Sequence, residues 1–271
     1  MRFSWGVRLE RERPASGSMT ARLCSDAFTE SSQNRQPSPE PGFCCWLAPH
    51  LGRGRLRVGE PMTYNVMISM DDCVVLCADR STFSVYTDDR SELSEQRVRK
   101  ITETPHGFIT ASGWADLIQP VKERFAGEEP ADVGAMLSII QEEQDLFHKR
   151  SPELARSWIP RSCWKMSIPM SRGVTAAFYD HEKQGLSALV SGGTIFSFPP
   201  GTPSDARDHV ESLFPQGHYV APSREIVCDA IRQVLASVTY LRGRCIPISQ
   251  EIDVAIHWGG SRRLLELTAL D

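Results

Sequence analysis

The chain has 271 residues, of which 41% are hydrophobic, and its formal net charge is −4 at pH 7. This length accommodates one domain of about 200 residues and an extension, and the composition is typical of a globular protein. The charge gives no electrostatic argument for nucleic acid, and the longest apolar runs are far too short to span a bilayer. We therefore expect neither nucleic acid nor a membrane as a partner.

Residues 1–61 differ in composition from the rest of the chain. They hold nine arginines, no lysine and six acidic residues, which gives a net charge of +3, and the run SSQNRQPSPEPG is predicted not to fold. Residues 1–62 are interpreted as a disordered leader, a propeptide, or upstream sequence from a misassigned start codon. The basic run GRGRLRVG also allows an RNA-binding leader, which deletion of residues 1–61 would test.

A regular pattern begins with Thr63–Met70, which is rich in β-forming residues. Two aspartates at 71–72 mark a tight turn, and Cys73–Ala78 returns as a buried strand. The chain has eight cysteines but no Cys-x-x-Cys pair, so we expect no zinc site. Cys73 and Cys77 point to the same face of their strand and are interpreted as small buried thiols in a reducing cytoplasm.

The elements that follow alternate between strands and pairs of helices. Residues 80–96 are polar and predicted as a loop, and 151–171 fit no single pattern. Strands are predicted over 97–102, 107–112, 174–179, 186–190, 194–198, 252–258 and 262–267. Helices are predicted over 115–125, 131–148, 203–213 and 223–240, and the second of them carries an apolar stripe that includes Val133 and Leu146. This order predicts an α+β fold, a four-layer αββα sandwich with helices outside and two sheets inside.

Four stretches of the chain resemble the proteasome β-subunit family of N-terminal nucleophile (Ntn) hydrolases, which includes the bacterial HslV-type peptidase and the ancestral β-subunit group. They are TYNVMISMDDCVVLCADRS, RKITETPHGFITASGWAD, GLSALVSGGTIFSF, and REIVCDAIRQVLASV leading into EIDVAIHW. Together they reach from Thr63 to about Trp258. The resemblance implies a domain over residues 63–271 with the αββα sandwich of this family and a nucleophile that processing makes N-terminal.

The resemblance also implies a set of site residues. Thr63 falls where the family has its nucleophile, Asp79 lies in an Ala-Asp-Arg-Ser context similar to the family's Ala-Asp-Ser-Arg, and Lys100 stands at the position of the catalytic lysine. Ser112 and Gly113 fall near the turn whose backbone N–H serves as the oxyanion donor. Which of these two donates is left open.

Three features depart from the family pattern. The connection between positions 79 and 100 is a few residues longer than usual, and the Gly-Ser-Gly expected before the third helix reads Pro-Gly-Thr-Pro at 200–203. The late Asp-x-x-Ser that supports the threonine amine is missing, and RGRCIPISQ at 242–250 offers Ser249 as support but no acid.

These residue types suit acyl transfer. A threonine hydroxyl needs a base, and a free α-amino group, with an unperturbed pKa of about 7.7–8.0, is partly neutral at cytoplasmic pH. Only an N-terminal threonine carries both groups. Lys100 would disfavour a second positive charge on that amine, Asp79 would hold Lys100, and backbone N–H groups near Ser112 and Gly113 would stabilise the oxyanion. No metal ion or organic cofactor is needed.

Two routes would expose Thr63: translation from Met62 followed by removal of the methionine, or cleavage of the 62–63 bond. Self-processing β-subunits usually have Gly before the threonine, whereas this chain has Met, so we favour the alternative start.

The resemblance therefore implies a cytoplasmic threonine endopeptidase that hydrolyses peptides or unfolded proteins inside a ring-shaped homo-oligomer, with an ATPase partner left open. Two alternatives belong to other functional classes. One is a catalytically silent β-like subunit, which retention of any residue before Thr63 would favour. The other is a related hydrolase of small amides, which comparison of peptide and amide substrates would separate.

Overall fold

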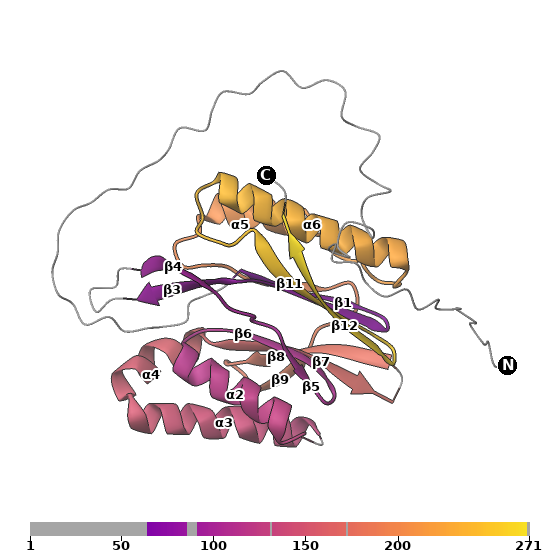
Figure 1. The fold of residues 1–271 in the computed structure, drawn as a ribbon. Helices are drawn as coiled ribbons and strands as arrows, with labels where there is room; N and C mark the ends of the chain where they lie inside the picture. The colour runs from indigo at the N-terminus through magenta and orange to yellow at the C-terminus, as the bar shows by residue number, and fades with distance from the viewer. Residues whose placement is uncertain (1–63, 86–90, 131, 172, 270–271) are drawn as a thin grey trace, which may run out of the picture. The chain divides into compact units, whose positions relative to one another are not determined.

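The chain folds around two five-stranded antiparallel sheets, as the computed structural model in Figure 1 shows. The structure describes residues 64–85, 91–130, 132–171 and 173–269, without the side chains of residues 83–96. The first sheet has the order β10-β1-β2-β11-β12, from Thr194–Ser197, Asn65–Met70, Cys73–Asp79, Glu251–Trp258 and Ser261–Thr268. The second has the order β5-β6-β7-β8-β9, from Thr102–Thr104, Gly107–Ser112, Cys163–Met170, Gly173–Asp180 and Gly185–Ala188.

Helices lie in two groups, one against each sheet (Figure 1). The helices α2, α3 and α4 and the short 3-10 helix η2 cover Ala115–Gly127, Val133–Arg150, Pro152–Trp158 and Ile159–Arg161. The second group consists of α5 and α6, which cover Ser204–Ser212 and Arg224–Gly243. Among the described residues, no helix has the length and apolar character that crossing a membrane requires.

Three apolar clusters set the order of the layers. One joins α5 and α6 to the first sheet, a second joins α2, α3 and α4 to the second sheet, and a third lies between the two sheets. Along β1, Val66 and Ile68 pack on the helix side, whereas Met67 between them packs against the other sheet. Because both faces of β1 and β2 are buried, these strands have continuous apolar runs rather than alternation.

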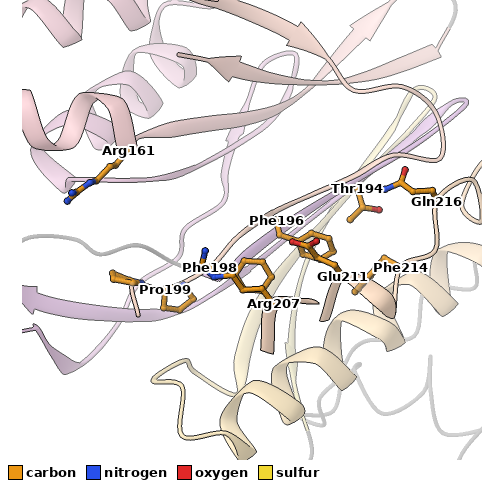
Figure 2. Close-up of a pocket in the computed structure, with 10 residues that line it drawn as sticks. Arg161, Thr194, Phe196, Phe198, Pro199, Arg207, Glu211, Phe214 and Gln216 are labelled. Atoms are coloured by element: carbon orange, nitrogen blue, oxygen red, sulfur yellow. The ribbon is translucent and has the colours of Figure 1, made fainter. Parts of the chain in front are cut away.

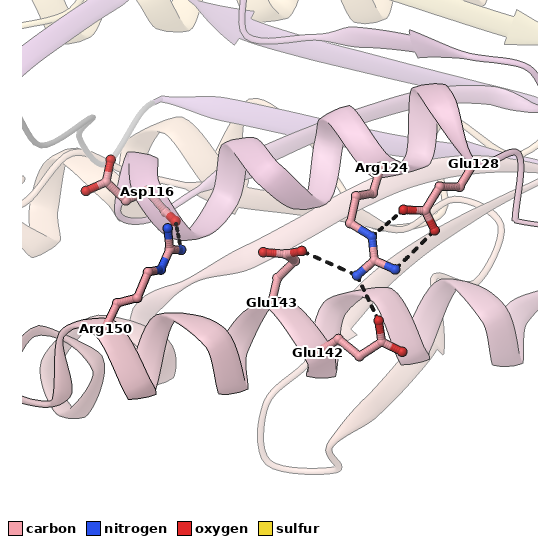
Figure 3. Close-up of polar contacts among 6 residues, drawn as sticks. All are labelled: Asp116, Arg124, Glu128, Glu142, Glu143 and Arg150. Atoms are coloured by element: carbon pink, nitrogen blue, oxygen red, sulfur yellow. Dashed lines mark hydrogen bonds and ion pairs between the residues drawn. The ribbon is translucent and has the colours of Figure 1, made fainter.

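A charged cluster links the two long helices of the lower group in Figure 1. Figure 3 shows the Arg124 guanidinium of α2 between Glu128 on its own side and two acids of α3, with nitrogen–oxygen distances of 2.9 Å to Glu142 and 3.3 Å to Glu143. Arg124 is one-quarter exposed and shares its charge among three carboxylates, so this network fixes how α2 and α3 pack without forming a pocket for chemistry.

Most predicted elements are confirmed, with boundaries shifted by a few residues. The hairpin that contains Cys73 and Cys77 forms as expected, and both thiols are buried in one cluster, where burial raises their pKa values. The start of the first predicted strand, at Thr63, lies outside the described residues.

Several predictions were wrong. Residues 80–96 are not a loop, because β3 and β4, Ser81–Val85 and Ser91–Arg97, pair as a hairpin through their backbones. The strand predicted over 97–102 is absent, since β4 ends at Arg97 and β5 begins only at Thr102. The unassigned stretch 151–171 holds α4, η2 and β7. On α3, Val133 and Leu146 are each 47% exposed and do not join the buried stripe.

Candidate active site

Asp79 ends β2 and its side chain is fully buried. One carboxylate oxygen accepts a hydrogen bond from the Lys100 ammonium at 3.2 Å. The other accepts from two backbone N–H groups, those of Ser81 at 3.0 Å and Ser249 at 3.3 Å. Three donors from three separate segments therefore hold one buried negative charge in place.

Lys100 is held by its backbone as well as by its side chain. Its N–H donates to Asp253 at 3.0 Å, and its carbonyl accepts from the Thr110 hydroxyl at 3.3 Å. The long connection from Asp79 does not carry Lys100 away, because it folds into the β3–β4 hairpin. The hairpin closes where the Val98 N–H donates to the Arg80 carbonyl at 3.1 Å. The expected Asp79–Lys100 pair is thus brought together as a buried ion pair.

Asp253 is a second buried carboxylate that the sequence reasoning missed. Besides the Lys100 N–H, it accepts from the Arg80 guanidinium, with nitrogen–oxygen distances of 2.8 and 2.9 Å. Arg80 also pairs with Glu266 at 2.7 Å. The signal that could have found Asp253 is an acid within the apolar run EIDVAI, because a buried acid in a strand requires a partner.

Ser112 ends β6, and Gly113 follows it in the turn that leads into α2. The Ser112 hydroxyl lies 3.2 Å from that of Ser197 on β10, so the second sheet contacts the first at this point. Gly113 has a φ of +140°, and a Cβ at this position would lie 2.1 Å from the Ser162 hydroxyl oxygen. Glycine is therefore required for this turn, whose backbone is the one expected to donate to an oxyanion.

Ser249 contacts the site through Asp79, while the Thr63 amine that it was expected to support lies outside the described residues. Its backbone N–H donates to Asp79, while its hydroxyl accepts from the Glu251 N–H at 3.0 Å. Ser249 thus supports the carboxylate of the site and caps the start of β11.

Thr63 lies outside the described residues, and Tyr64 follows it. The Tyr64 carbonyl accepts a hydrogen bond from the Asp79 N–H at 3.0 Å, which joins the start of β1 to the end of β2. The Tyr64 hydroxyl bonds with Ser237 of α6, and burial raises its pKa. The residue after Thr63 is therefore fixed beside the ion pair of Asp79.

A cavity of about 590 Å³ lies beside β10 and α5 (Figure 2). Its lining includes three aromatic rings, two guanidinium groups and one carboxylate, from Phe196, Phe198, Phe214, Arg161, Arg207 and Glu211. The Phe198 ring contacts that of Tyr64, with centroids 5.8 Å apart, and the Arg207 guanidinium lies 5.8 Å from the Phe198 centroid. The cavity thus meets Phe198, whose ring separates it from the buried Tyr64 side chain.

In the part of the chain that the structure describes, no group of three or more His, Cys, Asp or Glu side chains is arranged to hold a metal ion. Comparison with models of known protein families gave no match, and comparison with curated proteins gave no significant match.

Proposed function

We propose that the chain is a threonine peptidase of the proteasome β-subunit type, an Ntn hydrolase that cuts peptide bonds through Thr63. In this proposal the two antiparallel sheets and their helices form the αββα sandwich of that family. The substrate is a peptide or unfolded protein, and the active form is a ring-shaped homo-oligomer in the cytoplasm.

The observation that carries the proposal is the buried Asp79–Lys100 pair beside the start of β1. Thr63 directly precedes Tyr64 in the sequence. The Tyr64 carbonyl is bonded to the N–H of Asp79 itself. A buried lysine held by a carboxylate next to a candidate nucleophile is an arrangement in which the charge can act on the chemistry.

The proposed reaction is acyl transfer followed by hydrolysis. The free amine of Thr63 takes the proton of the Thr63 hydroxyl, directly or through water, as the oxygen attacks the peptide carbonyl. Lys100 disfavours protonation of that amine before the attack, and Asp79 keeps Lys100 in position. Backbone N–H groups at Ser112 and Gly113 stabilise the oxyanion. The amine passes its proton to the leaving nitrogen, and water then hydrolyses the ester of Thr63.

The test is hydrolysis of a panel of fluorogenic peptides by the purified protein and its Thr63→Ala variant. The wild type should release the fluorophore. In the variant kcat should fall at least about 10³-fold, because alanine has no hydroxyl to attack the peptide carbonyl and form the oxyanion. A Thr82→Ala variant, which changes another threonine on the following hairpin, is the control. Equal rates for wild type and Thr63→Ala would refute the proposal.

A further inference from the structure

Lys165 on β7 is a second buried lysine, 1% exposed, that the sequence reasoning passed over. Its ammonium donates to the Asn65 side-chain oxygen and to the Ser197 hydroxyl at 2.9 Å. Two longer contacts reach the backbone carbonyls of Asn65 at 3.4 Å and Ile195 at 3.5 Å. Every one of these partners is neutral, and no carboxylate among the described residues forms an ion pair with Lys165.

A lysine in this environment is costly to the fold. Burial of an ammonium group without a carboxylate is strongly unfavourable, whereas a neutral amide or hydroxyl could make similar hydrogen bonds at a lower cost. Desolvation lowers the pKa of Lys165 to about 8. The positive charge is therefore a feature that packing alone does not explain.

Lys165 connects the start of β1 with the turn that follows β6. Its partner Asn65 is two residues after Thr63, and its partner Ser197 bonds with Ser112, which precedes Gly113. A chain of hydrogen bonds thus runs from the strand that begins after Thr63, through Lys165, to the turn at the end of β6. The amide nitrogen of Asn65 is buried and has no hydrogen-bond partner in the described part of the chain.

We propose that Lys165 is a positioning residue for the reaction of Thr63, one that fixes the start of β1 against the β6 turn and adds a second positive charge beside Asn65, two residues after Thr63 in the sequence. The proposal rests on the proposed function, since it assigns a role within the same site. In this proposal, Asn65 connects Lys165 to the start of β1. The charges of Lys165 and Lys100 together keep the Thr63 amine neutral.

Among the described residues, few other titratable groups lie around Lys165. On the same strand, a negative charge on Cys163 would raise the pKa of Lys165. Burial raises the pKa of the Cys163 thiol and so favours its neutral form. The strands on either side present Thr110 and Phe178 opposite Lys165.

The Asp79–Lys100 pair lies beyond Thr110, whose hydroxyl bonds to the Lys100 carbonyl. Lys100 is thus paired with Asp79, whereas the hydrogen-bond partners of Lys165 among the described residues are all neutral.

The experiment compares the protein that begins at Thr63 with its Lys165→Met and Lys122→Met variants. Both substitutions remove a buried lysine and keep its length, but Lys122 lies on α2 and bonds to Gln119 outside the site. Lys165→Met should lower kcat at least about 10-fold with little change in KM, and Lys122→Met should not. Removal of a positive charge makes protonation of the Thr63 amine easier, so the acidic limb of kcat/KM should move to higher pH by about one unit.

A second readout does not need turnover. Competitive acetylation of the N-terminal amine, measured by mass spectrometry across pH, reports the pH at which the Thr63 amine loses its proton. This pH should be higher in Lys165→Met than in wild type. If a wild type with an N-terminal Thr63 hydrolyses no peptide, the proposed function fails, whereas the acetylation shift still decides the role of Lys165.

Unchanged kcat and an unchanged acetylation profile in a folded Lys165→Met protein would overturn the proposal. If that variant does not fold, Ser197→Ala takes its place, because it keeps the lysine and removes the hydroxyl that joins Lys165 to Ser112. Ser197→Ala should then lower kcat several-fold while the variant keeps a cooperative thermal unfolding transition. Full activity in Ser197→Ala would equally overturn the proposal.

Discussion

At the scale of single residues, the site depends on charges buried with their partners. Asp79 takes one ammonium and two backbone donors, and Asp253 takes the Arg80 guanidinium and the N–H of Lys100. The buried acids Asp79 and Asp253 are thus both paired with bases, and Arg80 also reaches the half-exposed Glu266. Such a network is sensitive to loss of one member, because the remaining charge keeps its desolvation cost and loses its compensation.

Asp79→Asn tests this sensitivity. The substitution keeps the shape of the side chain but removes the carboxylate from the buried Lys100 ammonium, so the free energy of unfolding should fall by about 3–5 kcal/mol. Urea unfolding followed by circular dichroism measures the change. Asp116→Asn, at an exposed position in the first turn of α2, should cost no more than about 1 kcal/mol. Equal stability of the two variants would show that the Asp79–Lys100 pair contributes little.

At the scale of elements, the turn from β6 into α2 decides where the candidate oxyanion donors lie. Gly113 adopts a backbone conformation that other residues rarely adopt, and the Ser162 hydroxyl fills the space where a Cβ would stand. Ser162 cannot move away easily, because its hydroxyl donates to the Trp158 carbonyl at 2.8 Å. The end of α4 therefore buttresses the turn.

Gly113→Ala should destabilise the protein by about 2–3 kcal/mol, from backbone strain and the contact with Ser162. It should also lower kcat, because the N–H groups of the turn move. Gly127→Ala is the matched control, since a Cβ at that helical position meets no atom within 4 Å. It should leave stability unchanged or raise it by up to about 1 kcal/mol. Thermal unfolding of both variants measures the difference, and a similar loss in the two would contradict the role given to Gly113.

At the scale of the whole molecule, the spacing of apolar residues predicted the elements that bury one face, and continuous apolar runs predicted the strands that are buried on both faces. Helix α2 was found from Leu117, Ile118, Val121 and Phe125, all of which are buried. The β3–β4 hairpin was missed because its sequence is polar and its pairing is carried by the backbone. The exposure of Val133 shows the limit of a stripe read near a helix end, where the neighbouring layer no longer covers the helix.

The site could be predicted only in part, for a physical reason. Asp79 and Lys100 are 21 residues apart, and a resemblance carried by short stretches located them. Asp253 and Lys165 reach their partners Lys100 and Asn65 across 153 and 100 residues of sequence. No local pattern encodes which strands meet in space, so these two residues became visible only when the sheets were in place.

The most direct test of the proposed peptidase is the identity of the N-terminal residue in protein purified from its native cells, determined by mass spectrometry. The proposed mechanism requires a chain that begins at Thr63, because an amide nitrogen in place of the free amine cannot accept the hydroxyl proton. A mature chain that begins at Thr63 is the predicted result. A mature chain that keeps Met62 or any earlier residue would contradict the mechanism and leave the Asp79–Lys100 pair with a structural role.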